Sequence, residues 1–253
     1  MIIIPMAGNS SRFFNAGYQV PKYQLPLWGM PMFDWVLKTF ENYFQSEEFR
    51  FIVRKDLNVK DFVEERCTLL GITDFSIVEL EHETKGQAET VYLSLTKEDM
   101  DKSICIFNAD SFDLSFKMPD LNQMPGLLDV FLGEGDHWSF VKPAESEKTI
   151  LNTGNIGKVE STTEKNRISN LCSDGMYFFR NAKLFVDAYI SGQEQVEQEN
   201  KEIYIAPLYN QLIKKGISVY YRMVQSSTLY FCGTPDEYNY LLQIKTPSIN
   251  YKK

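Results

Sequence analysis

A loop near the start of the chain combines residues that could hold a phosphate group. It reads Ala7-Gly8-Asn9-Ser10-Ser11-Arg12, and a second cation, Lys22, follows ten residues later, directly after Pro21. Glycine and small polar residues let backbone amides turn toward phosphate oxygens, and an arginine can bind those oxygens with two parallel hydrogen bonds. The loop matches neither the Walker pattern nor the dinucleotide-binding glycine pattern. Its composition alone fits a flexible polar loop as well as a phosphate site.

A carboxylate stands where a metal ion could be held. Asp110 follows the apolar run 104–107, which predicts a buried strand, and ligands bind beyond the carboxyl ends of such strands in open α/β sheets. Mg²⁺ takes one or two protein carboxylates and completes its coordination with phosphate oxygens and water. We therefore expect Asp110 to hold Mg²⁺ against a triphosphate. Asp113 is interpreted as a turn residue rather than a second ligand.

A third charged cluster is not informative by itself. Glu164-Lys165 lies in a polar segment, with Asn170 shortly after it. An adjacent glutamate and lysine in such a segment usually form a solvated ion pair of little energetic value. Only two histidines occur, His82 and His137, so a mechanism that needs a histidine base has few candidates.

Charge and cysteine content exclude several functions. The chain has 253 residues with a net charge of −8 and a pI of about 5.0. A negative net charge is the wrong sign for a protein that binds along a phosphate backbone, so nucleic acid is not an expected partner. The four cysteines (Cys67, Cys105, Cys172 and Cys232) are far apart and form no metal-ligand or disulfide pattern, so we expect buried free thiols.

The N-terminus and the apolar runs argue against a membrane protein. The chain begins Met1-Ile2-Ile3-Ile4-Pro5 without a basic segment, and no apolar run reaches membrane-spanning length. We expect a cytoplasmic protein with no membrane partner. The sequence leaves open whether copies of the chain form a homo-oligomer.

Strand and helix patterns alternate through the first half of the chain. Apolar runs predict strands at 2–4, 51–53, 75–80 and 104–107, and apolar residues at three- and four-residue spacing predict helices at 31–45, 59–70 and 88–95. Such alternation indicates right-handed crossovers between parallel strands. The expected fold is α/β, with a mostly parallel central sheet flanked by helices.

The pattern changes after about residue 115. Residues 118–135 carry prolines and glycines and read as a loop. Beyond them, strands are expected at 138–141, 156–162, 176–179, 219–221 and 228–232, and helices at 182–191, at 203–215 and from Pro235. No linker or repeat is visible, so residues 1–253 are expected to form one domain with two halves, about 1–115 and about 116–253.

Together these segments resemble the sugar-phosphate nucleotidyltransferases, which are pyrophosphorylase-type enzymes with a GT-A-like, Rossmann-like fold. The matching motifs are Ala7-Gly8, Ser11-Arg12, Pro21-Lys22, Gly29-Met30-Pro31-Met32, Lys85-Gly86-Gln87-Ala88-Glu89-Thr90, Asn108-Ala109-Asp110 and Glu164-Lys165. The likeness covers essentially the whole chain. It implies that the first half binds a nucleoside triphosphate (NTP) and the second half a phosphorylated acceptor. We expect no C-terminal β-helix of the kind that some family members carry.

The resemblance also implies roles for particular residues. Nucleotide binding would fall to Ala7, Gly8, Asn9, Ser10, Ser11, Gly86, Gln87 and Asn108. Catalysis would fall to Arg12 at the leaving pyrophosphate, Lys22 at the α-phosphate and Asp110 as the ligand of Mg²⁺. Acceptor binding would fall to Glu164, Lys165, Asn170, Glu202 and Tyr204.

A narrower likeness is to the subgroup that serves capsule and surface-polysaccharide synthesis. It rests on segments such as 138–141, 168–170, 202–210 and 233–235. It favours CTP over UTP or TTP, and an acceptor that is a sugar phosphate or an unusual capsule precursor such as phosphoglutamine. The expected products are the CMP-linked acceptor and pyrophosphate.

Three departures from the family pattern bear on these expectations. Phe231 stands where many members have a second metal-binding Asp, Ala109 replaces a common glycine, and Asn166 replaces the proline after Glu-Lys. Two alternatives are therefore retained. One is a GT-A glycosyltransferase that uses a sugar nucleotide, although the spacing of Asp110 and Asp113 does not match its Asp-x-Asp motif. The other is a non-catalytic nucleotide-binding homologue.

Overall fold

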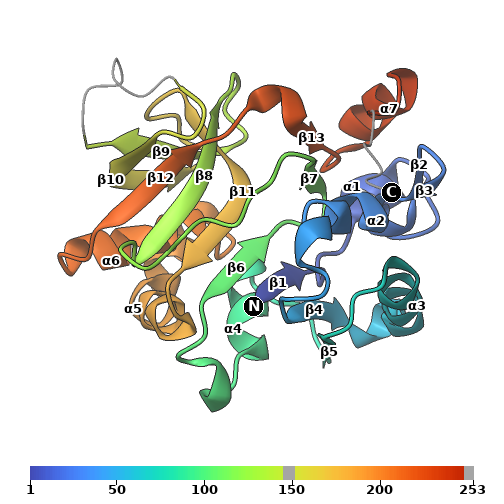
Figure 1. Ribbon diagram of the computed structural model, residues 1–253, viewed down its shortest axis with the longest axis horizontal. Coiled ribbons are helices and arrows are strands. Elements are labelled where there is room, and N and C mark those ends of the chain that lie inside the picture. The colour runs from blue at the N-terminus through green and yellow to red at the C-terminus, as the bar shows by residue number, and fades with distance from the viewer. Residues whose placement is uncertain (145–151, 248–253) are drawn as a thin grey trace.

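The computed structural model describes residues 1–144 and 152–247 (Figure 1). The strands of its main sheet are β1 (Ile2–Pro5), β4 (Phe49–Arg54), β5 (Phe75–Leu80), β6 (Ile104–Phe107), β8 (Gly126–Leu132), β9 (Ser139–Pro143), β10 (Ile156–Glu164), β11 (Leu171–Phe179) and β12 (Val219–Met223). They lie in the order β5-β4-β1-β6-β11-β8-β12-β10-β9, with an additional pairing of β11 and β9. The chain passes from β1 to β4 and β5 on one side and then to β6 on the other. The boundary between β1 and β6 is thus the topological switch point, where sheets of this kind bind ligands.

The first half of the sheet is parallel, as the alternating pattern predicts. β1 pairs in parallel with β4 and β6, and β4 pairs in parallel with β5. Successive side chains of β1 point to opposite faces: Ile2 and Ile4 pack on one side of the sheet and Ile3 on the other. All three are fully buried, which explains the continuous apolar run.

The second half of the sheet is mixed, so the expectation of a mostly parallel sheet holds only for the first four strands. β11 runs antiparallel to β6 and β8, and β10 runs antiparallel to β12 and β9, while β8 and β12 are parallel. Among the described residues no helix lies between the start of β9 and the end of β11, and without a crossover helix neighbouring strands pair antiparallel.

The expected loop at 118–135 contains β8, a central strand. The strand begins at Gly126, where an added Cβ would lie 2.8 Å from Cε1 of the buried Tyr209 ring. This glycine is therefore needed for packing and does not mark a turn. Sequence reasoning took it for a turn signal and missed the strand.

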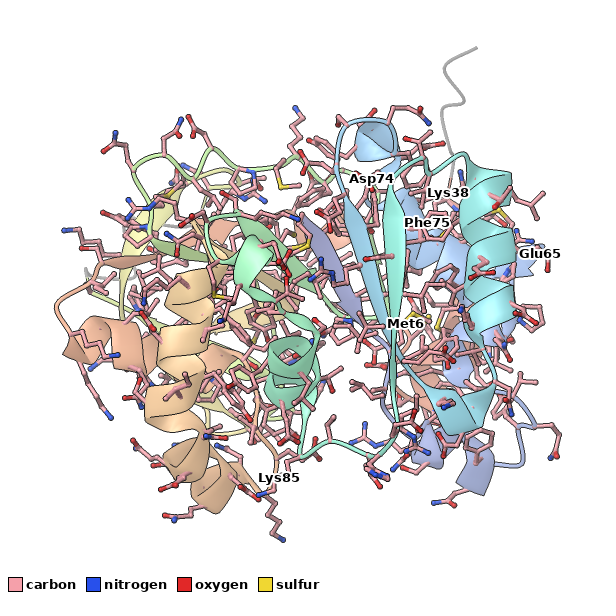
Figure 2. The ribbon with its side chains drawn as sticks, turned by 90° about the horizontal axis from the view of Figure 1, so that it is seen from below. Met6, Lys38, Glu65, Asp74, Phe75 and Lys85 are labelled. Carbon is pink, nitrogen blue, oxygen red and sulfur yellow. The ribbon has the colours of Figure 1, made fainter. Side chains whose placement is uncertain are left out.

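Helices cover both faces of the sheet. They are α1 (Ser11–Asn15), α2 (Met32–Lys38), α3 (Lys60–Leu70), α4 (Gln87–Ser94), α5 (Ala182–Asn200), α6 (Tyr209–Lys214) and α7 (Pro235–Gln243). Helix α3 stands on one side of β4 and β5, with Glu65 on its outer surface, and α4 and α5 stand on the other side (Figure 2).

Three helices differ in length from the prediction. The helix expected at 203–215 consists of a 3₁₀ turn, Ala206–Leu208, followed by α6 at Tyr209–Lys214. Helix α2 ends at Lys38 and is followed by a 3₁₀ turn, Glu41–Tyr43, rather than continuing to residue 45. Helix α5 continues to Asn200 instead of ending at 191. Gly192, within the helix, is buried where an added Cβ would lie 2.6 Å from Cγ of Gln211, so it allows α5 to pack closely against α6.

Two small sheets complete the fold. One joins β7 (Ser111–Asp113) to β13 (Leu229–Phe231), and the other joins β2 (Pro26–Leu27) to β3 (Met30–Pro31). Because Phe231 pairs with Ser111, the C-terminal segment lies beside the end of β6. Helix α7 then begins with a capping box in which Thr234 and Glu237 bond each other's backbone amides.

Two further expectations can be compared with the structure. The four cysteines are free and buried, as predicted. Within residues 1–144 and 152–247, no helix combines the length and apolar character that crossing a bilayer requires.

Candidate active site

A cleft with a volume of about 1070 Å³ opens at the carboxyl ends of β1 and β6. Every sequence-predicted site residue except Asn170 lines it: Ala7, Gly8, Asn9, Ser10, Ser11, Arg12, Lys22, Gly86, Gln87, Asn108, Asp110, Glu164, Lys165, Glu202 and Tyr204. Both halves of the chain contribute residues to its lining. The topology thus gathers residues that are up to about 200 positions apart in the sequence.

The loop after β1 forms one wall and is anchored at both ends. At its start the Met6 amide donates to the Ile52 carbonyl oxygen at 2.7 Å, which continues the pairing of β1 with β4. Further on, Ser10 adopts a left-handed conformation with φ of 49°, and its hydroxyl accepts a 3.3 Å hydrogen bond from the Lys22 amide. The guanidinium of Arg12 is exposed and has no hydrogen bond or ion pair among the described residues. This cation is therefore available to a ligand.

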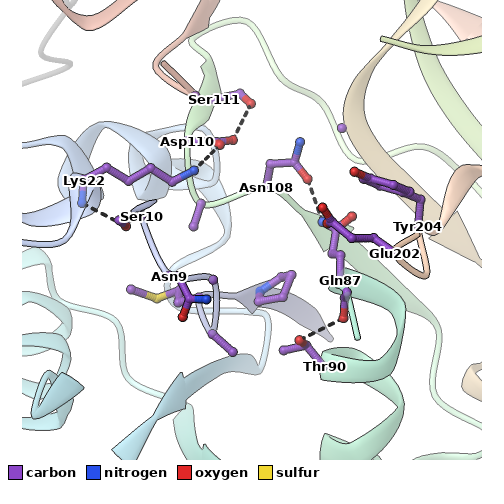
Figure 3. A pocket seen from close by; sticks show the side chains of 18 of the residues that line it. Asn9, Ser10, Lys22, Gln87, Thr90, Asn108, Asp110, Ser111, Glu202 and Tyr204 are labelled. Carbon is purple, nitrogen blue, oxygen red and sulfur yellow. Dashed lines mark hydrogen bonds and ion pairs between the residues drawn. The ribbon is translucent and has the colours of Figure 1, made fainter. Parts of the chain in front are cut away.

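Lys22 and Asp110 meet in the middle of the cleft (Figure 3). Lys22 Nζ lies 2.5 Å from Asp110 Oδ2, and each side chain is 22% exposed. The other carboxylate oxygen, Oδ1, accepts from the Ser111 hydroxyl at 3.4 Å. A cation and a carboxylate are thus held together at the switch point of the sheet.

The opposite wall begins at the N-terminus of α4. Gly86 has φ of 142°, and a Cβ there would lie 2.6 Å from the Ile203 amide nitrogen, so only glycine fits. This close approach is held by two backbone hydrogen bonds, from Ile203 to the Lys85 carbonyl oxygen at 2.8 Å and from Ala88 to the Ile203 carbonyl oxygen at 2.9 Å. As a result Glu202 and Tyr204, which flank Ile203, lie beside Gln87 (Figure 3).

Gln87 and Asn108 are joined by their side-chain amides. Gln87 Nε2 donates to Asn108 Oδ1 at 2.6 Å. This bond uses one N–H of Gln87 and leaves its Oε1 as an acceptor with no partner among the described residues. The pair therefore presents an oriented amide oxygen to the cleft.

The far end of the cleft carries a lysine and a buried carboxyl group. Lys165 Nζ lies 2.5 Å from the Tyr204 hydroxyl and 4.5 Å from the centre of its ring. The neighbouring Glu164 side chain is only 5% exposed and accepts a hydrogen bond from the Ser139 hydroxyl. Burial raises the pKa of Glu164 above its ordinary value, against the opposing effects of Ser139 and Lys165. An anionic ligand here would meet Lys165 as the exposed charge.

Asn170 is not among the residues that line the cleft, and its assignment to the acceptor site stays a prediction. Its side-chain oxygen accepts from Arg167 Nη1 at 3.1 Å, and its carbonyl oxygen accepts from the Gly133 amide at 3.3 Å. Asn170 supports a turn at the edge of β11. Its closeness in sequence to Lys165 is not matched in space because the turn at 165–170 carries it away from the cleft.

Several lining residues escaped sequence reasoning. Asp174 is 3% exposed, and its Oδ1 accepts from the Met176 amide at 2.9 Å. Burial and the nearby Asp129 raise its pKa well above the ordinary range. The signal that could have found it is a lone acid within the apolar strand 171–179. Trp138 also lines the cleft, with its ring centre 4.7 Å from that of Phe231.

Solved structures of known proteins share this fold. A nucleoside-diphosphate-sugar pyrophosphorylase from Vibrio cholerae RC9 has 45% sequence identity and a TM-score of 0.87, over 96% of this chain and 100% of that chain. The chain belongs to the nucleoside-diphosphate-sugar pyrophosphorylase family. The predicted nucleotidyltransferase fold is thereby confirmed. No protein-family model and no curated protein matches.

More distant pyrophosphorylase-like structures agree in fold alone. A UDP-glucose pyrophosphorylase solved with UDP-glucose has 15% identity and a TM-score of 0.70, over 95% of this chain and 96% of that chain. An inositol-1-phosphate CTP transferase from T. maritima has 15% identity and a TM-score of 0.68, over 95% of this chain and 94% of that chain. One fold thus serves different nucleotides and acceptors, so it does not decide between them.

An aromatic ring, that of Phe231, stands at the position where the family resemblance implies a second carboxylate. Phe231 packs on Trp138 and on Phe131, whose ring centre is 5.4 Å away. Another carboxylate comes from α7 instead: Asp110 Oδ2 and Glu237 Oε2 lie 3.3 and 3.5 Å from the point where Gly233 would carry a Cβ. Among the described residues no group of three or more His, Cys, Asp or Glu gathers as a metal site.

Proposed function

We propose that this pyrophosphorylase transfers a nucleotidyl group, CMP in preference to UMP or TMP, from an NTP to a phosphorylated small molecule and releases pyrophosphate. The observation that carries the proposal is the arrangement of Arg12, Lys22 and Lys165 around one cleft, with Asp110 beside Lys22. Carboxylates line the same cleft, so these three cations are individually placed charges and not a general positive field, in a protein with a net charge of −8. A few placed cations suit the phosphates of a single nucleotide, whereas the negative net charge does not suit nucleic acid.

The reaction is an in-line displacement at the α-phosphorus. An acceptor phosphate oxygen forms a bond to that phosphorus, and the bond to the bridging oxygen of pyrophosphate breaks. The attacking oxygen is already an anion, so no general base is needed, in keeping with the scarcity of histidine. Lys22 neutralises charge at the α-phosphate, Arg12 and the amides of loop 8–12 bind the leaving pyrophosphate, and Lys165 binds the acceptor phosphate. Catalysis then rests on positioning and charge neutralisation.

The residues present fit Mg²⁺. The half-buried Asp110 would supply one hard oxygen ligand, with the nearby Glu237 as the second carboxylate in reach of the same space. Few protein ligands suit this ion because phosphate oxygens and water complete its octahedral coordination. When bound, Mg²⁺ neutralises charge on the triphosphate.

The preference for CTP is supported by the pair Gln87 and Asn108. Because Asn108 fixes the Gln87 amide, its free Oε1 is an acceptor, which matches the exocyclic amino group of cytosine and not the carbonyl oxygen of uracil. Replacing Asn108 by Ala frees the amide to turn. We expect the ratio of kcat/KM for CTP to that for UTP to fall by about tenfold, equivalent to one hydrogen bond.

For the acceptor we propose a sugar phosphate or a capsule precursor such as phosphoglutamine, and a role in capsule or surface-polysaccharide synthesis. Lys165 next to the buried Glu164 provides a charge for the phosphate and a polar group for the remainder of the molecule. We propose that the enzyme works in the cytoplasm without a membrane partner; association into homo-oligomers is a matter for direct measurement.

The test is pyrophosphate release. The protein is mixed with each of CTP, UTP and TTP, with Mg²⁺, and with a panel of phosphorylated sugars and amino acids. Release that depends on both NTP and acceptor supports the proposal. Turnover of a sugar nucleotide without NTP favours a glycosyltransferase, and NTP binding without turnover across the panel favours a non-catalytic homologue.

A further inference from the structure

The side chain of Asn9 is held between two other segments of the protein. Its Oδ1 accepts a hydrogen bond from Arg54 Nη1, and its Nδ2 donates to Glu83 Oε1. Donor and acceptor are matched at both ends of the amide, so the side chain has one orientation in this network. Asn9 belongs to the loop that faces the triphosphate, whereas Glu83 belongs to the segment that leads to Gly86. The Asn9 side chain therefore links the two nucleotide-facing segments, and its backbone amide is left for the phosphates.

The sheet explains why Arg54 can reach this position. Arg54 is the last residue of β4, which lies between β1 and β5. On the β1 side, Pro5 pairs with Ile52, so the phosphate loop begins beside the end of β4. On the β5 side, Arg54 itself pairs with Leu80, so the segment containing Glu83 begins there. Arg54 thus ends the strand that lies between β1 and β5, the two strands that these loops follow.

The guanidinium is itself fixed. Arg54 Nε and Nη2 donate to the two carboxylate oxygens of Asp56 at 2.8 and 2.6 Å. This two-point pairing sets the plane of the guanidinium and directs the remaining Nη1 at Asn9. The Arg54 side chain is 12% exposed, against 61% for Asp56, so the arginine is anchored within the structure and is not a freely moving surface charge.

We propose that Arg54 is a positioning residue for the nucleotide: acting through Asn9, it fixes the phosphate loop and the nucleobase segment relative to each other before an NTP binds. The inference rests on the proposed function, since it concerns the NTP site. Fixing the two segments in advance lowers the ordering cost of binding. Loss of the arginine therefore weakens NTP binding without removing a group that touches the reacting atoms.

The experiment is a double-mutant cycle on NTP binding. Arg54→Gln, Asn9→Ala and the double variant are titrated with CTP and with UTP in the presence of Mg²⁺ by calorimetry. Each single change is expected to weaken binding about tenfold, and the double change no further, because both break the same link. In turnover, KM for the NTP rises while KM for the acceptor stays unchanged. Hydrogen exchange of residues 6–12 in the nucleotide-free protein is expected to be faster in both single variants.

Two further variants complete the design. Lys55→Gln removes the neighbouring exposed ion pair with Glu81, in which both side chains are at least 60% exposed, and is the matched control expected to bind as the wild type. Arg54→Lys keeps the charge but not the planar fork, so it is expected to weaken binding while folding normally.

The outcomes separate this inference from the proposed function. Additive effects of the two single changes would mean that Arg54 contacts the phosphates independently of Asn9, and this would overturn the inference. Wild-type affinity of Arg54→Gln or of Arg54→Lys for the NTP would also overturn the inference. If the wild-type protein binds no NTP, the proposed function fails and the inference with it.

Discussion

Lys22 Nζ lies 2.5 Å from Asp110 Oδ2, across 88 residues of sequence, in the centre of the cleft. The two side chains are thus ion-paired. Under the proposed function, a triphosphate with Mg²⁺ would attract both of them, the lysine to phosphate and the carboxylate to the metal. We propose that the ion pair is exchanged for ligand contacts on binding. Because both side chains are partly exposed, it contributes at most about 1 kcal/mol to stability.

This relationship predicts that Lys22 matters for turnover and not for folding. Lys22→Ala is expected to lower kcat by about a hundredfold or more, since it removes a charge placed where the transition state develops charge. The thermal midpoint should stay within a few degrees of the wild type. Pyrophosphate release and thermal unfolding measure the two effects. Lys142→Ala, which breaks an exposed ion pair with Glu160, is the control, and wild-type turnover by Lys22→Ala would exclude the assigned role.

Asp110 and Glu237 should differ in their effect on metal dependence. Asp110→Asn is expected to raise the Mg²⁺ concentration for half-maximal activity by at least about tenfold, because it removes the proposed ligand. Glu237→Gln should raise this Mg²⁺ concentration less, because the Glu237 carboxylate is already engaged in capping α7, where it accepts a hydrogen bond from the Thr234 amide at 2.9 Å. Activity titrations over Mg²⁺ and Mn²⁺ concentration provide the comparison. Equal Mg²⁺ curves for Asp110→Asn and wild type would contradict the assignment.

A stability prediction comes from Asp99 and Arg50, which form a two-point ion pair with distances of 2.6 and 3.1 Å. Burial opposes ionisation of Asp99, but hydrogen bonds from Arg50, the Thr96 amide and Lys102 outweigh it and lower its pKa. Asp99→Asn removes this two-point pairing, although Arg50 keeps its ion pair with Glu48 at 3.0 Å, and is expected to cost about 2 kcal/mol in the free energy of unfolding at pH 7.

The pH dependence of this effect has a definite sign. A lowered folded-state pKa stabilises the protein at pH values above the unfolded pKa of about 3.9. The contribution is lost as the pH falls through that value toward the lower folded-state pKa. Urea unfolding at pH 7 and at about pH 3 should therefore show a large difference between wild type and Asp99→Asn at pH 7 and a smaller one at pH 3. A difference that grows on acidification would contradict the pairing.

The sequence was informative where one local rule determines the structure. The run Ile2-Ile3-Ile4 is buried on both faces, so its continuous apolar character identified a parallel strand correctly. Prediction from the sequence failed where tertiary packing overrides a local signal. Gly126 and Gly192 both look like breaks, yet each is a glycine because a neighbouring side chain, Tyr209 or Gln211, occupies the space of a Cβ.

For the candidate site, motif spacing identified the residues at the ends of strands. It did not identify the residues that tertiary packing brings to the cleft. Asp110 follows an apolar strand and is visible in the sequence. Asp174 lies inside a strand, and Glu237 looks only like a helix cap. Nearness in sequence to Lys165 does not bring Asn170 into the lining of the cleft, because a turn lies between the two residues. The link from Arg54 to Asn9 depends on the sheet order β1-β4-β5, which no local pattern specifies.

Lys165 provides the last prediction, at the acceptor end of the cleft. Lys165→Ala is expected to raise KM for the acceptor by about tenfold to a hundredfold, since a charged hydrogen bond to phosphate is lost, while KM for the NTP changes little. Tyr204→Phe keeps the ring under the ammonium and removes only the hydroxyl that lies 2.5 Å from Nζ, so it should have a smaller effect. Steady-state kinetics with each substrate varied in turn separates the two constants. An increase in KM for the NTP alone would place Lys165 on the nucleotide and require a different residue for the acceptor phosphate.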